Sequence, residues 1–227
     1  MSAARRRAYN RGVMTHLEPR PLLRGWLHLG AAVAAVAGFV ALALLADSPR
    51  AYVGGAVFAV SLVLLYTTSA TYHVVRWGRR MHALLKRLDH AMIFVVIAGS
   101  YTPFCLFAAD SAWGAGLLAA VWSVAGAGVV LKLVWPYAPR WLGVSLYIGT
   151  GWVALVAATE IVTWFALLPL LLLALGGVLY TVGGVIYALR RPDPFPRVFG
   201  YHEVFHALVI AGSAVHYSLV AAYLMPA

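Results

Sequence analysis

The sequence predicts an all-α integral membrane protein with seven transmembrane helices. Of its 227 residues, 63% are apolar and only 11% are charged, and the mean hydropathy is +0.85. Soluble globular domains carry about 25% charged residues, so the composition excludes that class. The apolar residues are also grouped into seven long runs that short polar segments separate. Repeated crossing of a bilayer requires this alternation.

Each apolar run is long enough to cross about 30 Å of hydrocarbon as a helix. The least marked boundary lies between Glu160 and Trp164, where we place a break because 141–189 would otherwise be one implausibly long helix. The chain therefore divides into a basic cytoplasmic segment, 1–25, and a transmembrane domain, 26–227. The predicted spans are 26–46, 52–75, 89–109, 113–135, 141–161, 164–189 and 202–225.

The basic residues predict the orientation of the spans. All of the 17 lysines and arginines except Arg50 lie before the first span or in or beside the breaks after the second, fourth and sixth spans, with Lys132 and Arg140 flanking the fourth break. Such residues concentrate on the cytoplasmic side, so we expect a cytoplasmic N-terminus and, with seven spans, a C-terminus outside. The alternative for the first run is a cleaved signal peptide with "ALA" at 41–43 as its processing site, but this run is long enough to span.

The same basic clusters predict which partners the protein has. They lie next to apolar runs and have no aromatic-rich soluble domain around them, which argues against nucleic acid. Their expected partner is the anionic lipid of the inner leaflet. The sequence leaves the oligomeric state open.

Five polar residues of three predicted spans lie at one depth. Ser69 and His73 are four residues apart, on one face near the cytoplasmic end of the second span. Asp89 begins the third span, and His202 and His206 occupy the first two turns of the seventh. With a rise of 1.5 Å per residue, all five fall within about 10 Å of the inner boundary. Ionisable groups inside a membrane cost about 2.5–3.5 kcal/mol on insertion scales, so this coincidence calls for a function.

Three of these five residues also have a simpler interpretation when each is considered alone. Asp89 would serve as a helix N-cap, Ser69 would bond to its own backbone, and His73 would lie at the interface. His202 and His206 are different, because two histidines at i and i+4 form a ready bidentate metal site. The single cysteine, Cys105, excludes a disulfide within the chain and a thiolate cluster, so a metal would need histidine and carboxylate ligands.

The remaining ionisable residues of the spans are expected outside this group. His28 should lie at the interface, Glu160 near water at the outer end, and Lys132 at the inner end with its amino group extended to the surface. His90 should point about 100° away from the carboxylate that precedes it. His216 should lie about 15 Å deeper than the other histidines of the seventh span.

The pentapeptide HEVFH at 202–206 matches H-E-x-x-H, the motif of zinc proteases, in which the glutamate is the general base. Glu203 lies about 100° around the helix from His202, and Asp89 offers another carboxylate for that role. We therefore predict that Glu203 supports the site indirectly or pairs with a loop arginine such as Arg197.

Three motifs together resemble the haemolysin III family, the bacterial branch of the progestin and adipoQ (adiponectin) receptor group. They are "SATYH" at 69–73, "DHAMIFVVIAGSYTPF" from Asp89, and "HEVFHALVIAGSAVHY" from His202. The resemblance covers about 20–225. It implies a zinc ion bound by His73, His202 and His206, a water on the zinc held by Asp89, and Ser69 as a supporting polar group.

The resemblance also implies an activity and a location. The wider superfamily includes alkaline ceramidases, so we expect a multi-pass protein of the bacterial inner membrane in which zinc activates water to hydrolyse an amide or ester bond of a lipid. The lipid would enter laterally from the inner leaflet. The alternative is a receptor or membrane-state sensor in which zinc is structural and no catalysis occurs.

Overall fold

A computed structural model describes residues 21–135 and 138–226, so most of the predicted basic segment 1–25 and part of the fourth break lie outside it. The described chain is helical, with a single isolated β-bridge between Phe195 and Phe199 as its only strand-like pairing. Seven helical spans are long and apolar enough to cross a membrane. The prediction of an all-α, seven-span membrane protein is confirmed.

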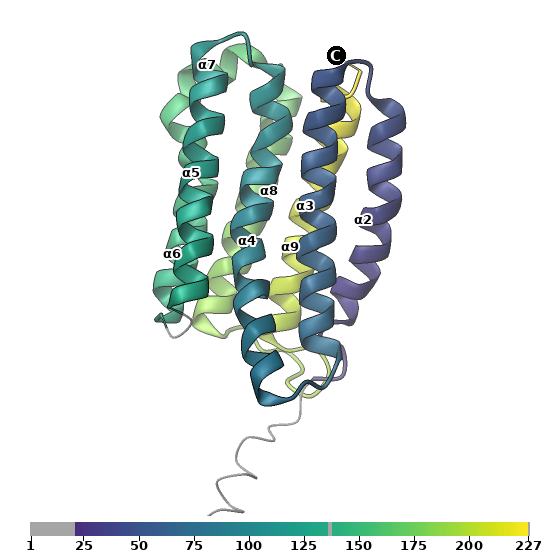
Figure 1. Ribbon diagram of the computed structural model, residues 1–227, viewed down its shortest axis with the longest axis vertical. Coiled ribbons are helices and arrows are strands. Elements are labelled where there is room, and N and C mark those ends of the chain that lie inside the picture. Colours follow the sequence, from purple (N-terminus) through teal and green to yellow (C-terminus); the bar gives the residue numbers. More distant parts are fainter. Residues whose placement is uncertain (1–20, 136–137, 227) are drawn as a thin grey trace, which may run out of the picture.

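The seven spans run up and down along the long axis of the molecule (Figure 1). Their boundaries agree with the predicted runs to within a few residues, except at the start of the third span and around the break after the fifth. In chain order they are α2 (Trp26–Leu45), α3 (Pro49–Val74), α4 (Arg79–Phe107), α5 (Ala112–Val134), a fifth span made of α6 (Arg140–Gly151), η1 (Val153–Ala157) and α7 (Ala158–Trp164), then α8 (Leu167–Leu189), and α9 (Tyr201–Leu219) continued by η2 (Val220–Leu224).

The third span begins earlier than predicted. Helix α4 starts at Arg79, so most of the basic break after the second span, 79–88, is helical, and Asp89 lies inside the helix. The prediction failed because hydropathy marks where the chain enters hydrocarbon, whereas Arg79, Arg80, Lys86 and Arg87 are good helix formers in any solvent. The connection between α3 and α4 extends past the beginnings of α2 and α9 (Figure 1). Because Asp89 lies ten residues after the start of α4 at Arg79, the interpretation of Asp89 as a helix N-cap is wrong.

The fifth span differs from a regular helix. Its break to α8 falls at Phe165 and Ala166, just beyond the predicted Glu160–Trp164, and Phe165 has extended backbone angles. After Gly151 the span also tightens into the 3₁₀ segment η1, which the sequence did not predict. Tyr101 of α4 holds this segment, since its hydroxyl donates to the Gly151 carbonyl at 2.6 Å and accepts from the Ala154 amide at 3.0 Å.

Glycines allow α8 to approach both of its neighbours closely. A Cβ at Gly176 would lie 2.2 Å from the ring of His216 on α9, and one at Gly183 would lie 3.2 Å from Leu208. The next residues, Gly177 and Gly184, face the fifth span. The seven-residue glycine repeat thus builds a close packing surface, as such small residues do in membrane helices.

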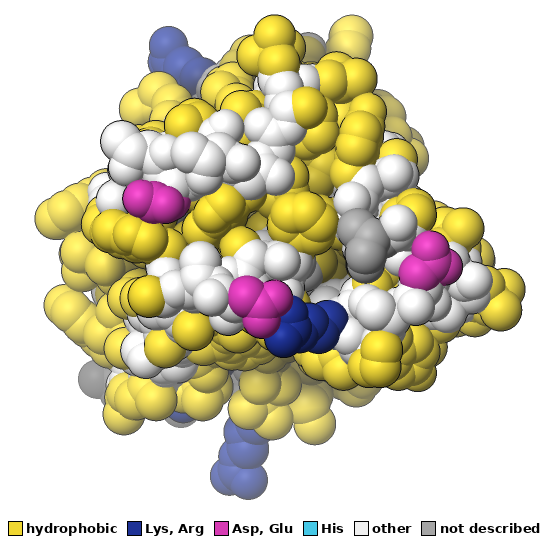
Figure 2. All heavy atoms as spheres, turned by 90° about the horizontal axis from the view of Figure 1, so that it is seen from above, with side chains coloured by type: hydrophobic (Ala, Val, Ile, Leu, Met, Phe, Trp, Pro, Cys, Tyr) yellow, Lys and Arg dark blue, Asp and Glu magenta, His cyan; other side chains and the backbone are white. Residues whose placement is uncertain are grey.

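Charge separates the two ends of the bundle. The basic end is the end where α2, α4, α6 and α9 begin, and it holds every described lysine and arginine except Arg50. The opposite end carries an exposed ion pair between Arg50 and Asp110 at 2.7 Å. Figure 2, viewed from that opposite end, shows a mostly apolar face with few charged side chains.

Candidate metal centre

Three buried histidines converge near the basic end. His73 lies in the last turn of α3, and His202 and His206 lie in the first two turns of α9. One ring nitrogen of each lies within 4.8 Å of the others, and the Nε2 atoms of His73 and His202 are 3.2 Å apart. The side chains are at most 9% exposed. The two helices thus bring together the three predicted ligands, which are far apart in the sequence.

The donor set fits a bound metal ion. The Nδ1 atom of His206 is buried without a hydrogen-bond partner among the described residues, which is costly unless something else satisfies it. Three imidazoles without a thiolate form a set that zinc accepts readily. The residues present therefore suit the metal that the sequence predicts.

A carboxylate and a hydroxyl adjoin the histidines. The Oδ2 atom of Asp89 on α4 lies 3.9 Å from Nε2 of His73, and its side chain is 13% exposed. The hydroxyl of Ser69 hydrogen-bonds to the same carboxylate. His90, expected to point elsewhere, has its Nδ1 3.6 Å from Asp89 but hydrogen-bonds to the Lys86 carbonyl at 2.8 Å. All five predicted residues thus lie together in the folded chain.

Glu203 has a structural partner that the sequence did not predict. Its carboxylate is fully buried and forms an ion pair with Arg24, which precedes α2, instead of Arg197. Its other oxygen accepts from the amide of Gly200 at 2.9 Å and caps α9. A carboxylate already engaged by two donors is poorly placed to act as the base of a zinc protease, so the prediction of an indirect role for Glu203 agrees with the geometry.

Two expectations from the sequence are wrong. His28 is not interfacial, because it is 2% exposed and its ring stacks on that of His206 with centroids 3.7 Å apart and planes 10° apart. Lys132 is 7% exposed and its amino group lies 5.2 Å from the ring centroid of Tyr147, so it is buried rather than extended to the surface. His216 lies away from the three ligands, as expected, and its Nε2 faces the Leu173 carbonyl at 3.1 Å.

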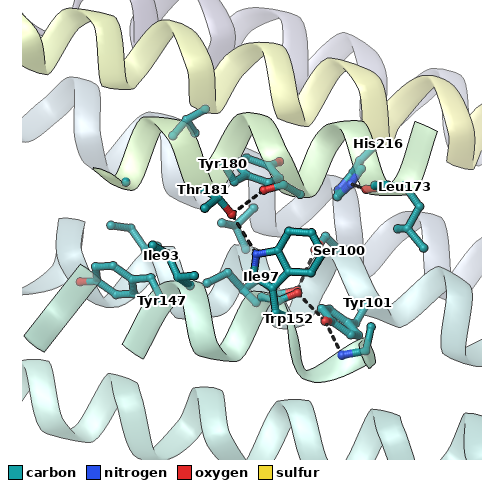
Figure 3. A pocket seen from close by; sticks show the side chains of 18 of the residues that line it. Ile93, Ile97, Ser100, Tyr101, Tyr147, Trp152, Leu173, Tyr180, Thr181 and His216 are labelled. Atoms are coloured by element: carbon teal, nitrogen blue, oxygen red, sulfur yellow. Dashed lines mark hydrogen bonds between the residues drawn. The ribbon is translucent and has the colours of Figure 1, made fainter. Parts of the chain in front are cut away.

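A long cavity begins at this cluster. It has a volume of about 390 Å³, and Ser69, Asp89, His202 and His206 form part of its wall. The remaining wall is mostly apolar and extends through α4, the fifth span and α8 to Phe165, near the opposite end. In Figure 3, Ile93 and Ile97 of α4 face this space from one side and Tyr180 and Thr181 of α8 from the other.

Hydrogen bonds join several residues of the cavity wall. The indole of Trp152 donates to the Thr181 hydroxyl at 2.9 Å, and Tyr101 holds the backbone beside it (Figure 3). The lining thus combines apolar surface with a few fixed polar groups, as small-molecule sites do.

The fold and the site define a seven-helix membrane protein with a buried three-histidine cluster. A family model described as "Haemolysin-III related" matches residues 17–217, and the chain belongs to this family. It is 34% identical to the Hemolysin-3 homolog of Bacillus subtilis (strain 168) over 167 residues, which cover 74% of this chain and 75% of that protein. It is 33% identical to the Hemolysin-3 of Bacillus cereus over 178 residues, or 78% and 77% of the two chains.

More distant relatives carry the name of a receptor. The Adiponectin receptor protein of Drosophila melanogaster is 28% identical over 179 residues, which cover 72% of this chain and 40% of that protein. The protein is therefore haemolysin III-like and adiponectin receptor-like, as the three sequence motifs indicate.

Proposed function

We propose that this protein is a zinc-dependent hydrolase of an amide or ester bond in a membrane lipid. One observation carries the proposal: two of the three histidines suited to zinc, His202 and His206, and the carboxylate of Asp89 line an apolar cavity of about 390 Å³, and the third histidine, His73, lies beside them. A hydrolase of this kind needs metal ligands, a proton acceptor and room for a lipid chain. Each of these parts has a counterpart in the described residues.

The protein's own residues have distinct roles in this reaction. Zinc, when bound by His73, His202 and His206, supplies a Lewis acid that lowers the pKa of water and polarises a carbonyl. Asp89 takes a proton from the water whose oxygen bonds to the acyl carbon. It then gives that proton to the amine or alcohol that leaves when the C–N or C–O bond breaks. The hydrogen bond from Ser69 orients the Asp89 carboxylate.

The cavity would hold the acyl chain and limit the access of water. Its apolar wall favours burial of hydrocarbon by about 25 cal/mol per Å². We further propose that the basic end faces the cytoplasm and binds anionic lipid, in the inner membrane of a bacterium. The substrate would then enter from the inner leaflet, next to the histidines.

The test is an assay of the purified protein for hydrolysis of ceramide-like lipids and of phospholipids. The protein is assayed as isolated, after treatment with a chelator, and after zinc is restored. We expect turnover of at least one lipid class, its loss with the chelator and its recovery with zinc. Absence of turnover by zinc-loaded protein on every lipid would overturn the proposal.

A receptor or membrane-state sensor is the second candidate, and the origin of the ligands favours it. The histidines come from α3 and α9, so a bound ion would tie these two helices together whether or not it reacts. The name of the Drosophila relative points to the same class. Full zinc occupancy without hydrolysis is the result that this candidate predicts.

A further inference from the structure

We propose that His28 is a positioning residue for the metal centre, and that it fixes the ring plane of His206 by stacking on it. This inference rests on the proposed metal site and adds a residue from a fourth helix, α2, to it. The rings are nearly parallel, with centroids 3.7 Å apart and planes 10° apart. Of the ring contacts among the described histidines, this one alone is a face-to-face stack, because the others are edge-on or tilted.

The environment of His28 directs its contacts to a single ligand, His206. The side chain is 2% exposed, and its ring nitrogens have no side-chain hydrogen-bond partner among the described residues; the polar group next to them is the backbone of His206. His28 is also not one of the three histidines whose nitrogens converge. Its contacts with the site, the ring stack and the approach to the backbone, are both made to His206, so its contribution to the site is the orientation of that residue.

His28 also contacts a second aromatic ring. The ring of Tyr66 on α3 meets it edge-on, with centroids 5.0 Å apart. The hydroxyl of Tyr66 donates to Ser213 of α9 at 2.7 Å. His28 thus packs against both Tyr66 and His206, which belong to the helices that carry the metal ligands, and its burial leaves it little freedom to tilt.

The start of α2 is fixed to the same site, which sets the height of His28. Gly25 has a left-handed φ of 83°, and a Cβ there would lie 2.6 Å from the Cβ of His73. The preceding residue, Arg24, pairs with the buried Glu203. Two residues next to each other in the sequence therefore contact the ligand-bearing turns of α3 and α9, and His28 follows one turn later.

Ring orientation matters because a metal ligand must direct its lone pair at the ion. Partners that orient ligating histidines typically contribute about 10–100-fold to metal affinity. A stacked ring can supply this constraint through its shape alone. The proposal therefore predicts that an aromatic ring of similar size, without nitrogens, replaces His28 and that a small side chain does not.

The experiment measures metal affinity on the full-length protein with zinc in competition with a chelator, and records the visible absorption of the Co²⁺-loaded protein. His28→Ala should weaken binding about 10–100-fold and alter the Co²⁺ bands, while His28→Phe should bind nearly as tightly as wild type. Leu42→Ala is the matched control, because Leu42 is equally buried on α2 but lies near its far end. It should lower stability and leave both the affinity and the bands unchanged.

A further variant, His28→Leu, fills the space without a ring and keeps the test decisive if the alanine variant does not fold. It should bind metal more weakly than His28→Phe. The proposal is overturned if His28→Ala or His28→Leu matches wild type, if His28→Phe is as weak as they are, or if Leu42→Ala weakens binding equally. If wild type itself binds no metal, the proposed zinc site is rejected, and the role of His28 with it. If wild type binds metal and the His28 variants do not differ as stated, only the role of His28 is rejected.

Discussion

Arg24 and Glu203 form an ion pair that joins two positions 179 residues apart in the sequence. The carboxylate is fully buried and the guanidinium is 21% exposed. Glu203 lies between the two histidines of α9 in the sequence, so the pair ties the segment before α2 to the turns that present the ligands. The pair gives the glutamate of the H-E-x-x-H match a structural role that does not require contact with a metal.

Breaking this pair should destabilise the protein. Arg24→Met leaves a buried carboxylate without its cation, and we expect a loss of about 1–3 kcal/mol in the free energy of unfolding. The double variant Arg24→Met/Glu203→Gln should recover part of the loss, because no charge is then left unpaired. Chemical denaturation of the single and double variants measures the coupling, and additive effects would show that the contact contributes nothing.

Removal of one ligand should release the metal. We expect one zinc per chain in wild type and affinity lower by orders of magnitude in His206→Ala, because one of three ligands is lost. A chelator should lower the melting temperature of wild type and not that of the variant. Elemental analysis after purification is the measurement, with His82→Ala, a histidine of α4 that is not among the converging ligands, as control. A fully occupied His206→Ala protein contradicts the ligand assignment.

Filling the cavity should discriminate between short and long lipids. Ile97 faces the cavity in Figure 3, so Ile97→Trp should shorten the space for an acyl chain while leaving zinc in place. We expect turnover of long-chain substrates to fall about 10–100-fold and that of short-chain substrates to change little. Val130→Trp is the control, because Val130 is 60% exposed on α5. Equal losses on short and long chains would argue against the cavity as the lipid site.

The orientation in the membrane predicts the location of the C-terminus. All basic residues except Arg50 lie on one side of the predicted topology, so a reporter fused after Ala227 should be active only if it is a type that folds outside the cytoplasm. Paired fusions of an external and a cytoplasmic reporter provide the measurement. Activity of the cytoplasmic reporter would show that the orientation is the opposite one and that the histidines lie in the outer leaflet.

The seven spans and the grouping of five site residues could be predicted because each rests on a local property of the chain. Hydropathy marks the spans, and the positions of Ser69, His73, Asp89, His202 and His206 within them set a common depth. The same depth argument applies to His28, which lies two residues after α2 begins at Trp26. Depth alone does not say which way a side chain points, so its stack on His206 could be found only in the folded chain.

The features that were missed depend on contacts between distant segments or on helix formation outside hydrocarbon. Arg24 was counted with the basic clusters, but its guanidinium meets Glu203 because α2 packs beside α9. Lys132 was expected to reach the surface, whereas Tyr147 of the fifth span covers it. The 3₁₀ turn after Gly151 depends on hydrogen bonds from Tyr101, a residue of another helix. None of these partners can be identified from the local sequence.

Asp89→Asn tests whether Asp89 transfers protons in a zinc-dependent hydrolysis. The side chain keeps its shape and loses its basicity, so the three imidazoles and the zinc should remain. Asp110→Asn is the matched control, since Asp110 is 82% exposed and pairs with Arg50 at the opposite end.

The decisive measurement is the rate of lipid amide or ester hydrolysis by wild type, Asp89→Asn and Asp110→Asn at matched zinc occupancy. We expect a loss of about 10²–10⁴-fold for Asp89→Asn and a wild-type rate for Asp110→Asn. A wild-type rate for Asp89→Asn would contradict this expectation, and loss of turnover in Glu203→Gln alone would return that role to the glutamate of H-E-x-x-H.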